Sequence, residues 1–188
     1  MSRWPSNPRG RLEQAAMDLF VERGYDQTTV ADIAMRAGLT ERTFFRHFAD
    51  KREVLFYGGP VLQDRMVGAV EAAPPEAAPL TAVAAGVTAV APMFAGRHAA
   101  ARLRQSIIDS HPELQEREVA KLAHLAEALA DALRARGVPD PAARLAADSG
   151  IAVFRAAFAQ WVTSPAGDMR PRIDECFDEF VKIAEAVR

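Results

Sequence analysis

Apolar residues recur along this chain at intervals of three and four positions, and the alternation typical of strands is almost absent. Spacing of that kind places the apolar side chains on one face of an α-helix. The first such stretch stops at Gly24 and has its inner face at Leu12, Ala15, Ala16, Leu19 and Phe20. The last, at about 170–187, carries a wide stripe of Ile173, Cys176, Phe177, Phe180, Val181, Ala184 and Val187. The pattern predicts an all-α fold.

Two short helices separated by a glycine turn are predicted between Thr29 and Phe48. Thr29 is a good N-cap, and Asp32 stands three residues later, as in a capping box. Gly38 suits the positive φ of a tight turn, and Thr40 caps the second helix. The buried faces are expected at Val30, Ile33, Ala34, Ala37, Leu39, Phe44 and Phe48. This arrangement is typical of a helix-turn-helix.

The rest of the chain is predicted to form further helices, separated by proline and glycine. One segment opens at Asp50 or Lys51 and is expected to bend or break at Gly58-Gly59-Pro60. Three prolines make residues 73–79 the clearest linker. Further helical stretches are expected at about 80–95, 97–109, 112–136 and 140–163. We therefore expect about nine helices in two domains, residues 1–50 and 51–188.

Composition fits a soluble globular chain whose charge is unevenly distributed. Of the 188 residues, 49% are hydrophobic and 26% are charged, which excludes wholesale disorder. The apolar runs are too short for a bilayer span, the N-terminus lacks a secretory signal, and Cys176 is the only cysteine, so we expect a cytoplasmic protein with no membrane partner. Residues 1–52 hold nine Lys and Arg against seven Asp and Glu, whereas the remainder hold fourteen against eighteen. The difference favours an anion-binding N-terminal module on an acidic body.

Residues 28–55, TTVADIAMRAGLTERTFFRHFADKREVL, resemble the helix-turn-helix signature of the TetR family of transcriptional regulators. Nearly every fixed position matches, and Phe45 stands where the family usually has tyrosine. The likeness covers about residues 9–56. It implies an N-terminal three-helix helix-turn-helix DNA-binding domain and a C-terminal helical ligand-binding and dimerisation domain. It also implies a homodimeric repressor that binds a palindromic operator in double-stranded DNA and is released by a small effector.

Ten residues are implied to contact DNA: Thr28, Thr29, Thr40, Glu41, Arg42, Thr43, Phe45, Arg46, His47 and Lys51. Threonines at helix N-termini suit phosphates, and His47 and Lys51 are placed for phosphates as well. Arg42 could bind guanine, and Glu41 could accept a hydrogen bond from cytosine. Phe45 lacks a hydroxyl that commonly reaches a phosphate, and contact with a thymine methyl is the alternative. A basic arm toward the minor groove or the backbone would comprise Arg3, Arg9 and Arg11.

The resemblance also implies that the last two long helices form a two-fold, four-helix dimer interface. Its expected residues are Leu145, Ser149, Ile151, Ile173, Phe177, Phe180, Val181 and Ala184. An effector pocket among the middle helices is expected at Met93, Phe94, Leu103, Arg104, Ile107, Leu122, Leu125, Phe154, Arg155, Phe158 and Trp161. Residues 102–161 are similar to domains of regulators that bind acyl-CoA-like molecules. The expected effector is therefore lipophilic or acyl-CoA-like.

Other functions find little support in the residues. The four histidines lack metal-ligand spacing, and the chain has no phosphate-binding glycine loop or nucleophile elbow. We therefore expect no catalytic residue, no metal and no cofactor, and we do not expect an enzyme. An all-α interaction protein without DNA binding and a ligand-binding enzyme stay open as alternatives. Thr29 and Thr40 would also cap helices in any protein, and the last helices could pack within one subunit alone.

Overall fold

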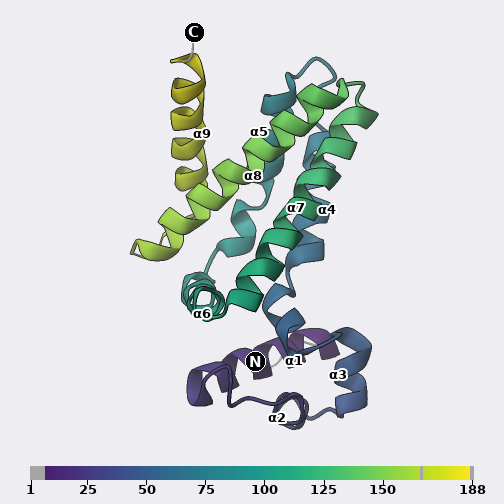
Figure 1. Ribbon diagram of the computed structural model, residues 1–188, viewed down its shortest axis with the longest axis vertical. Coiled ribbons are helices and arrows are strands. Elements are labelled where there is room, and N and C mark those ends of the chain that lie inside the picture. The colour runs from purple at the N-terminus through teal and green to yellow at the C-terminus, as the bar shows by residue number, and fades with distance from the viewer. Residues whose placement is uncertain (1–6, 166, 187–188) are drawn as a thin grey trace. The chain divides into compact units, whose positions relative to one another are not determined.

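The computed structural model describes residues 7–165 and 167–186, which form helices joined by turns (Figure 1). The α-helices are α1 (Pro8–Arg23), α2 (Val30–Arg36), α3 (Glu41–His47), α4 (Gly59–Glu71), α5 (Pro79–Ala89), α6 (His98–Asp109), α7 (Pro112–Ala135), α8 (Asp140–Thr163) and α9 (Arg170–Glu185). Two 3-10 helices, η1 (Lys51–Phe56) and η2 (Ala91–Phe94), accompany them, and these described residues contain no strand. The predicted all-α class and number of helices are confirmed for this part of the chain.

The chain divides into two compact units between Gly58 and Gly59, and in the first unit α1 packs against α2, α3 and η1. Most of the apolar positions that the periodicity predicted lie in its core: Leu12, Ala15, Ala16, Leu19, Phe20, Ile33, Ala34, Ala37, Phe44 and Phe48. Val30 and Leu39, which were also expected to be buried, are half-buried. Gly24 ends α1 with φ 85°, and Gly38 forms the turn between α2 and α3 with φ 65°. Both angles lie in the left-handed region, where a Cβ atom would be strained. The two glycines therefore set the directions in which α2 and α3 leave their turns.

The boundary of the first unit lies eight residues beyond the predicted one. Asp50 caps η1 by accepting a hydrogen bond from the Glu53 N–H at 3.1 Å. The following turn buries Val54, Leu55 and Phe56. Removing these three apolar side chains from water ties residues 51–56 to the helix-turn-helix rather than to the helices that follow.

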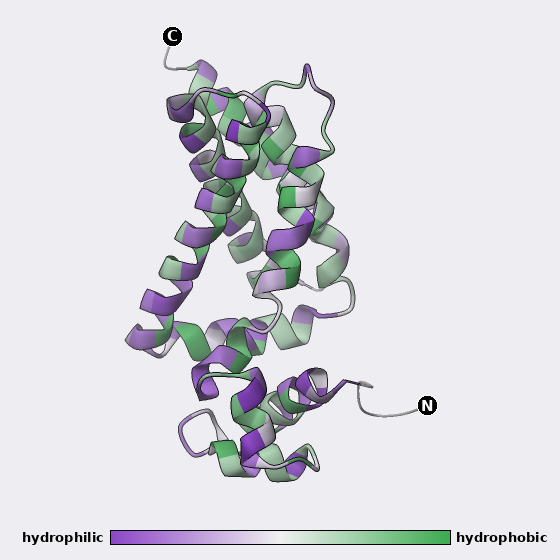
Figure 2. Ribbon diagram, turned by 90° about the vertical axis from the view of Figure 1, so that its right-hand side faces the viewer, coloured by the Kyte–Doolittle hydropathy of each residue, from purple (hydrophilic) through white to green (hydrophobic). Residues whose placement is uncertain are grey.

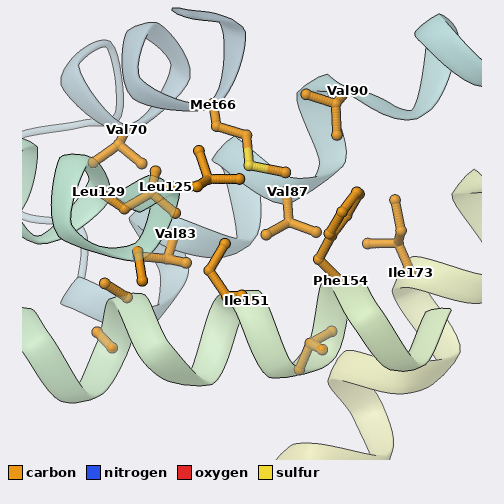
Figure 3. Close-up of a cluster of buried hydrophobic side chains, with 14 of the residues drawn as sticks. Met66, Val70, Val83, Val87, Val90, Leu125, Leu129, Ile151, Phe154 and Ile173 are labelled. Carbon is orange, nitrogen blue, oxygen red and sulfur yellow. The ribbon is translucent and has the colours of Figure 1, made fainter. Parts of the chain in front are cut away.

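In the second unit, α5 packs against both α4 and α8, α7 packs against α4 and α8, and α9 packs against α8. Apolar side chains from these helices form one cluster, shown in Figure 3. Along the same helices hydrophilic and hydrophobic residues alternate, as expected for helices with one buried face (Figure 2). A Cβ atom added at Gly150 would lie only 2.1 Å from Val83 Cγ1. Glycine is therefore needed where α8 meets α5.

One connection agrees with the sequence expectations and one helix differs from them. The proline-rich stretch expected as a linker, 73–79, joins α4 to α5 inside the second unit. The Arg136 guanidinium holds this turn by donating to the carbonyl oxygens of Ala73 at 2.7 Å and Pro74 at 2.6 Å. The helix expected at 80–95 is two elements, α5 and η2, because Pro92 has no N–H to continue the α-helical hydrogen bonding.

No single helix in the described ranges is long and apolar enough to span a membrane. The segments Pro79–Phe94 and His98–Asp109, which are bent by 107° relative to each other, reach that length and hydropathy together, by length and composition only.

Candidate DNA-binding site

The N-terminus of α2 is held by a complete capping box. The Thr29 hydroxyl accepts a hydrogen bond from the Asp32 N–H at 3.1 Å, and the Asp32 carboxylate accepts one from the Thr29 N–H at 3.0 Å. Hydrogen bonds from the Thr29 hydroxyl and N–H, together with the Arg23 charge, hold the pKa of Asp32 below its ordinary value. Thr29 remains exposed. The predicted cap is confirmed, and its contact with a phosphate stays a prediction.

The third helix has one buried face and one exposed face, as a recognition helix requires. Thr40 caps it by accepting a hydrogen bond from the Thr43 N–H at 3.2 Å. Phe44 is fully buried, and Thr43 is half-buried. The exposed face carries four of the predicted DNA contacts, namely Glu41, Arg42, Phe45 and Arg46.

The two arginines on this exposed face are available to bind a partner. Neither Arg42 nor Arg46 forms an ion pair with any residue that the structure describes. Elsewhere in the unit, by contrast, Arg36 pairs with Glu22 and Arg52 pairs with Asp50. Two unpaired guanidinium groups one helical turn apart suit an anionic surface such as DNA.

Two predicted phosphate contacts are placed differently from the expectation. Thr28 is 1% exposed, and its hydroxyl donates to the Gly24 carbonyl at 2.8 Å, so this side chain does not face solvent. The Lys51 ammonium donates to the carbonyl oxygens of Tyr25 at 2.8 Å and Thr28 at 3.0 Å and lies 4.0 Å from the centroid of the Tyr25 ring. Burial lowers the pKa of Lys51. The hydrogen bonds of Thr28 and Lys51 therefore hold the backbone of the loop between α1 and α2 in place.

Two arginines of the expected basic arm, Arg9 and Arg11, are also placed differently from the expectation. Arg9 lies in α1, with its guanidinium carbon 5.4 Å from the Phe48 ring centroid and 5.1 Å from the Tyr57 ring centroid. Arg11 donates to the Ala37 carbonyl at the C-terminus of α2. Both arginines thus contact groups inside the first unit, whereas Arg3 lies outside the described residues.

His47, in the last turn of α3, is half-buried. Its Nε2 atom is buried and has no hydrogen-bond partner within the part of the chain that the structure describes. The predicted contact of His47 with a phosphate stays a prediction. The loop function of Tyr25 was missed from the sequence, because a backbone carbonyl that accepts a hydrogen bond leaves no mark on residue identity.

The second unit brings several expected effector residues together. Phe94 lies with its ring centroid 6.2 Å from that of Phe154, 5.8 Å from that of Phe158 and 5.5 Å from that of Trp161. His98, which the sequence analysis did not select, contacts Trp161 edge-on at 4.9 Å and lies with Nε2 3.0 Å from the Trp161 carbonyl. These rings form a continuous aromatic cluster.

Other expected pocket residues are placed elsewhere. Arg155 is exposed, Arg104 forms an ion pair with Glu118 at 2.9 Å, and Leu125 is buried within the apolar core. Ile107 is also buried, whereas Met93, Leu103 and Leu122 are partly buried. A cavity of about 280 Å³ lies between α8 and α9, and the side chains around it include Ala152, Ala156, Gln160, Cys176, Phe180 and Ile183.

The residues expected at a dimer interface separate into two groups. Ile151 and Ile173, expected at the dimer interface, are buried within their own protomer because α8 and α9 pack against neighbouring helices there, so these two side chains are not exposed to a second protomer. Leu145, Val181 and Ala184 are exposed, whereas Ser149, Phe177 and Phe180 are half-buried. Val187 of the predicted stripe lies outside the described residues.

Comparison with known proteins identifies both parts of the chain. Residues 13–57 match the model of bacterial regulatory proteins of the tetR family, and residues 77–184 match that of the MftR C-terminal domain. The chain belongs to the TetR family. This family consists of regulatory proteins, so membership confirms the expectation that the chain is not an enzyme. No group of three or more His, Cys, Asp or Glu residues able to hold a metal ion occurs in the searched, described part of the chain.

Two curated regulators illustrate the N-terminal likeness. The chain is 38% identical over 82 residues to the HTH-type transcriptional regulator TcmR of Streptomyces glaucescens, a match covering 44% of this TetR-family chain and 36% of TcmR. It is 45% identical over 47 residues to the HTH-type transcriptional repressor KstR2 of Mycobacterium tuberculosis, covering 25% and 24% of the two chains. The matches therefore span about a third or less of these relatives.

Solved structures extend the likeness over nearly the whole chain. FadR from Bacillus subtilis, crystallised with stearoyl-CoA, aligns with a TM-score of 0.61 at 20% identity over 89% of this chain and 95% of that chain. Thermus thermophilus FadR, a repressor crystallised with lauroyl-CoA, aligns with a TM-score of 0.53 at 21% identity over 90% and 91%. At these identities the likeness establishes a shared fold.

Proposed function

We propose that this TetR-family regulator is a homodimeric repressor that acts in the cytoplasm, binds a palindromic operator through α2 and α3, and is released by a small, largely apolar effector. The observation that carries the proposal is the exposed face of α3, where Arg42 and Arg46 form no ion pair with any described residue and buried Phe44 anchors the helix. The exposed capping threonines, Thr29 and Thr40, support phosphate contacts beside it.

Arg42 is proposed to read guanine through O6 and N7, and Glu41 to accept a hydrogen bond from cytosine N4. Arg46 and His47 are proposed to contact phosphates. Thr43 is half-buried beside Thr40, and its hydroxyl lies 3.1 Å from the Thr40 hydroxyl; we propose that this hydroxyl also contacts the DNA. In this arrangement the phosphate contacts set the register and the base contacts set the sequence.

The test for operator binding is selection of DNA from a random pool, followed by a salt titration of the selected site. Arg42→Ala should weaken binding to that site by about 1–3 kcal/mol and relax base preference at one position of each half-site. Arg102→Ala is the matched control, since Arg102 is exposed on α6 and its loss removes the same charge. If wild type selects no DNA, or both variants lose affinity equally, the proposed operator contact is wrong.

Support for the dimer comes from apolar side chains on α8 and α9 that the protomer leaves in solvent. Leu145 is 68% exposed, Ile183 61% and Val181 42%. Asp148 and Arg155 are exposed on α8, and neither has a partner among the residues that the structure describes. Two-fold contacts place the same patch of both protomers together, and such a patch can cover its apolar residues and pair its opposite charges.

Sedimentation equilibrium of single-aspartate variants tests this interface. Ile183→Asp should shift the protein from dimer toward monomer, because a carboxylate placed in an apolar interface is desolvated without a partner. Val119→Asp is the control, since Val119 is 58% exposed on α7 and lies outside the proposed surface. Dimers that tolerate Ile183→Asp, or are disrupted equally by Val119→Asp, would show that the protomers associate elsewhere.

Support for an apolar effector comes from the aromatic cluster around Phe94 and from the acyl-CoA ligands named for two FadR structures of the same fold. The test measures operator release by a series of acyl-CoAs of increasing chain length, with free CoA and free fatty acids as separate arms. Release that grows with acyl length, and that Phe158→Ala alters, supports the proposal. If none of these compounds releases the operator, acyl-CoAs and fatty acids are excluded as effectors.

A further inference from the structure

Phe45 is an exposed aromatic ring on an otherwise polar helix surface. Its exposed fraction is 55%, although a phenyl ring gains free energy when it leaves water. Arg42 lies three residues before Phe45 on the same helix face, and exposed Arg46 follows Phe45 directly; neither arginine forms an ion pair with a residue that the structure describes. An exposed apolar ring with Glu41 and Arg42 one turn away and Arg46 beside it fits a partner that offers charged, polar and apolar groups together, as the edges of bases in DNA do.

The ring of Phe45 is braced. It meets the ring of Phe44 edge to face, with centroids 5.5 Å apart and planes at 83°. Phe44 is completely buried and packs on Phe48 at 5.4 Å. The contact with these packed, buried rings therefore limits the positions that the Phe45 side chain can take, which reduces the conformational entropy that Phe45 loses on binding.

In the major groove, the main apolar feature on the base edges is the C5-methyl group of thymine. A phenyl ring has no hydrogen-bonding atom, so it can distinguish bases there through that methyl group and through shape. We infer that Phe45 is a specificity-determining residue that reads the C5-methyl group of one thymine in each operator half-site, beside the base contacted by Arg42. This inference rests on the proposed operator binding.

Two consequences separate this contact from a phosphate contact. First, removing the methyl group alone should cost affinity. Burying one methyl group contributes roughly 0.8 kcal/mol, which corresponds to a loss of about fourfold for each half-site. Second, no counterion is released by an apolar contact, so the dependence of affinity on salt should be the same with and without the phenyl ring.

The experiment uses the full chain and the site that wild type selects from a random DNA pool. Each thymine of the selected site is replaced in turn by deoxyuridine, which differs only by the missing methyl group. Wild type should lose about fourfold for each half-site at one symmetric position and change little at the others. At that position 5-methyldeoxycytidine should be bound more tightly than deoxycytidine, because it restores the methyl group.

Phe45→Ala should bind the thymine and deoxyuridine sites equally, with an unchanged salt slope. Phe45→Tyr should keep the thymine preference, because the ring remains. Met35→Ala is the matched control, since Met35 is an apolar residue of α2 with 73% exposure, and it should retain the preference. Thermal unfolding of each variant identifies any loss caused by misfolding.

Four results would overturn the inference: a selected site without thymine, no thymine whose methyl group matters to wild type, a methyl preference that survives in Phe45→Ala, or a reduced salt slope in Phe45→Ala. A wild-type protein that selects no DNA at all refutes the proposed operator binding itself, so the two failures are distinguishable. A reduced salt slope in Phe45→Ala would show that the substitution acts by disturbing cationic contacts to phosphates and not by removing a methyl contact.

Discussion

Replacing Lys51 with methionine is expected to loosen the loop that leads into α2. Methionine keeps the length and apolar character of the side chain but removes the ammonium group. The carbonyl oxygens of Tyr25 and Thr28, which accept from Lys51 Nζ at 2.8 and 3.0 Å, would each lose this donor. Since Thr28 directly precedes the N-cap of α2, the variant should also weaken DNA binding.

The magnitude follows from the contacts. A hydrogen bond that involves a charged group contributes about 1.5–3 kcal/mol, and a half-exposed cation–π contact adds about 0.5 kcal/mol. Burial of the ammonium opposes these gains, as the lowered pKa of Lys51 indicates, and partial exposure reduces them further. We expect a net loss of about 2 kcal/mol in the free energy of unfolding of the first unit.

Two assays are needed, urea unfolding and a salt titration of operator binding. If Lys51 only positions the loop, unfolding becomes easier and affinity falls, while the slope of log affinity against log salt stays the same. Lys51→Arg should recover part of both losses, because its guanidinium can donate to the same carbonyl oxygens. Arg52→Met is the matched control, since Arg52 is exposed and pairs only with neighbouring Asp50 among the described residues.

A phosphate contact would give the opposite pattern. The salt slope would decrease by about 0.9 for each phosphate released, with stability unchanged. That result would refute the loop function and restore the expectation drawn from the sequence.

Two further predictions concern the packing and capping of single residues. Gly150→Ala should lower the free energy of unfolding by about 1–3 kcal/mol in thermal or urea unfolding, because the new methyl group would overlap buried Val83. Gly68→Ala, a helical glycine with nothing within 4 Å, should instead stabilise by about 0.5–1 kcal/mol, and equal effects would contradict the close approach at Gly150. Asp32→Asn should flatten the acid dependence of stability, because the pKa of Asp32 is held below 3.8 by Thr29, so the carboxylate's contribution is complete above pH 3.8 and is lost as pH falls through the lower folded value. An unchanged acid profile would show that the capping box adds no pH-dependent stability.

Local patterns were sufficient for much of the fold. The helix at 8–23, the capping box at Thr29, the glycine turn at Gly38 and the buried pair Phe44 and Phe48 all follow from periodicity and short-range hydrogen bonding. Each depends on residues no more than four or five positions apart, so a single sequence contains the necessary information. The exposure of the α3 face that carries Arg42 is predictable for the same reason, since it is opposite the buried aromatic residues.

The errors arose where a side chain meets a partner distant in sequence. Lys51 and Arg11 each bind carbonyl oxygens 23 to 26 residues away, and Thr28 was buried by the packing of α1. Ile173 was assigned to a dimer surface because its helix has a wide apolar stripe, but part of that stripe packs on α8. Periodicity identifies which residues share a face and leaves open what covers that face.

By itself, then, the sequence determined the helical class, the helix-turn-helix and the exposed face of α3, because helix formation and capping are local. Only the tertiary structure decided which basic side chains remain available. It directs Lys51, Arg9 and Arg11 to carbonyls and rings inside the first unit and leaves Arg42 and Arg46 in solvent. The physical reason is that a cation's role depends on its nearest acceptor, and folding brings acceptors from distant segments within hydrogen-bonding distance.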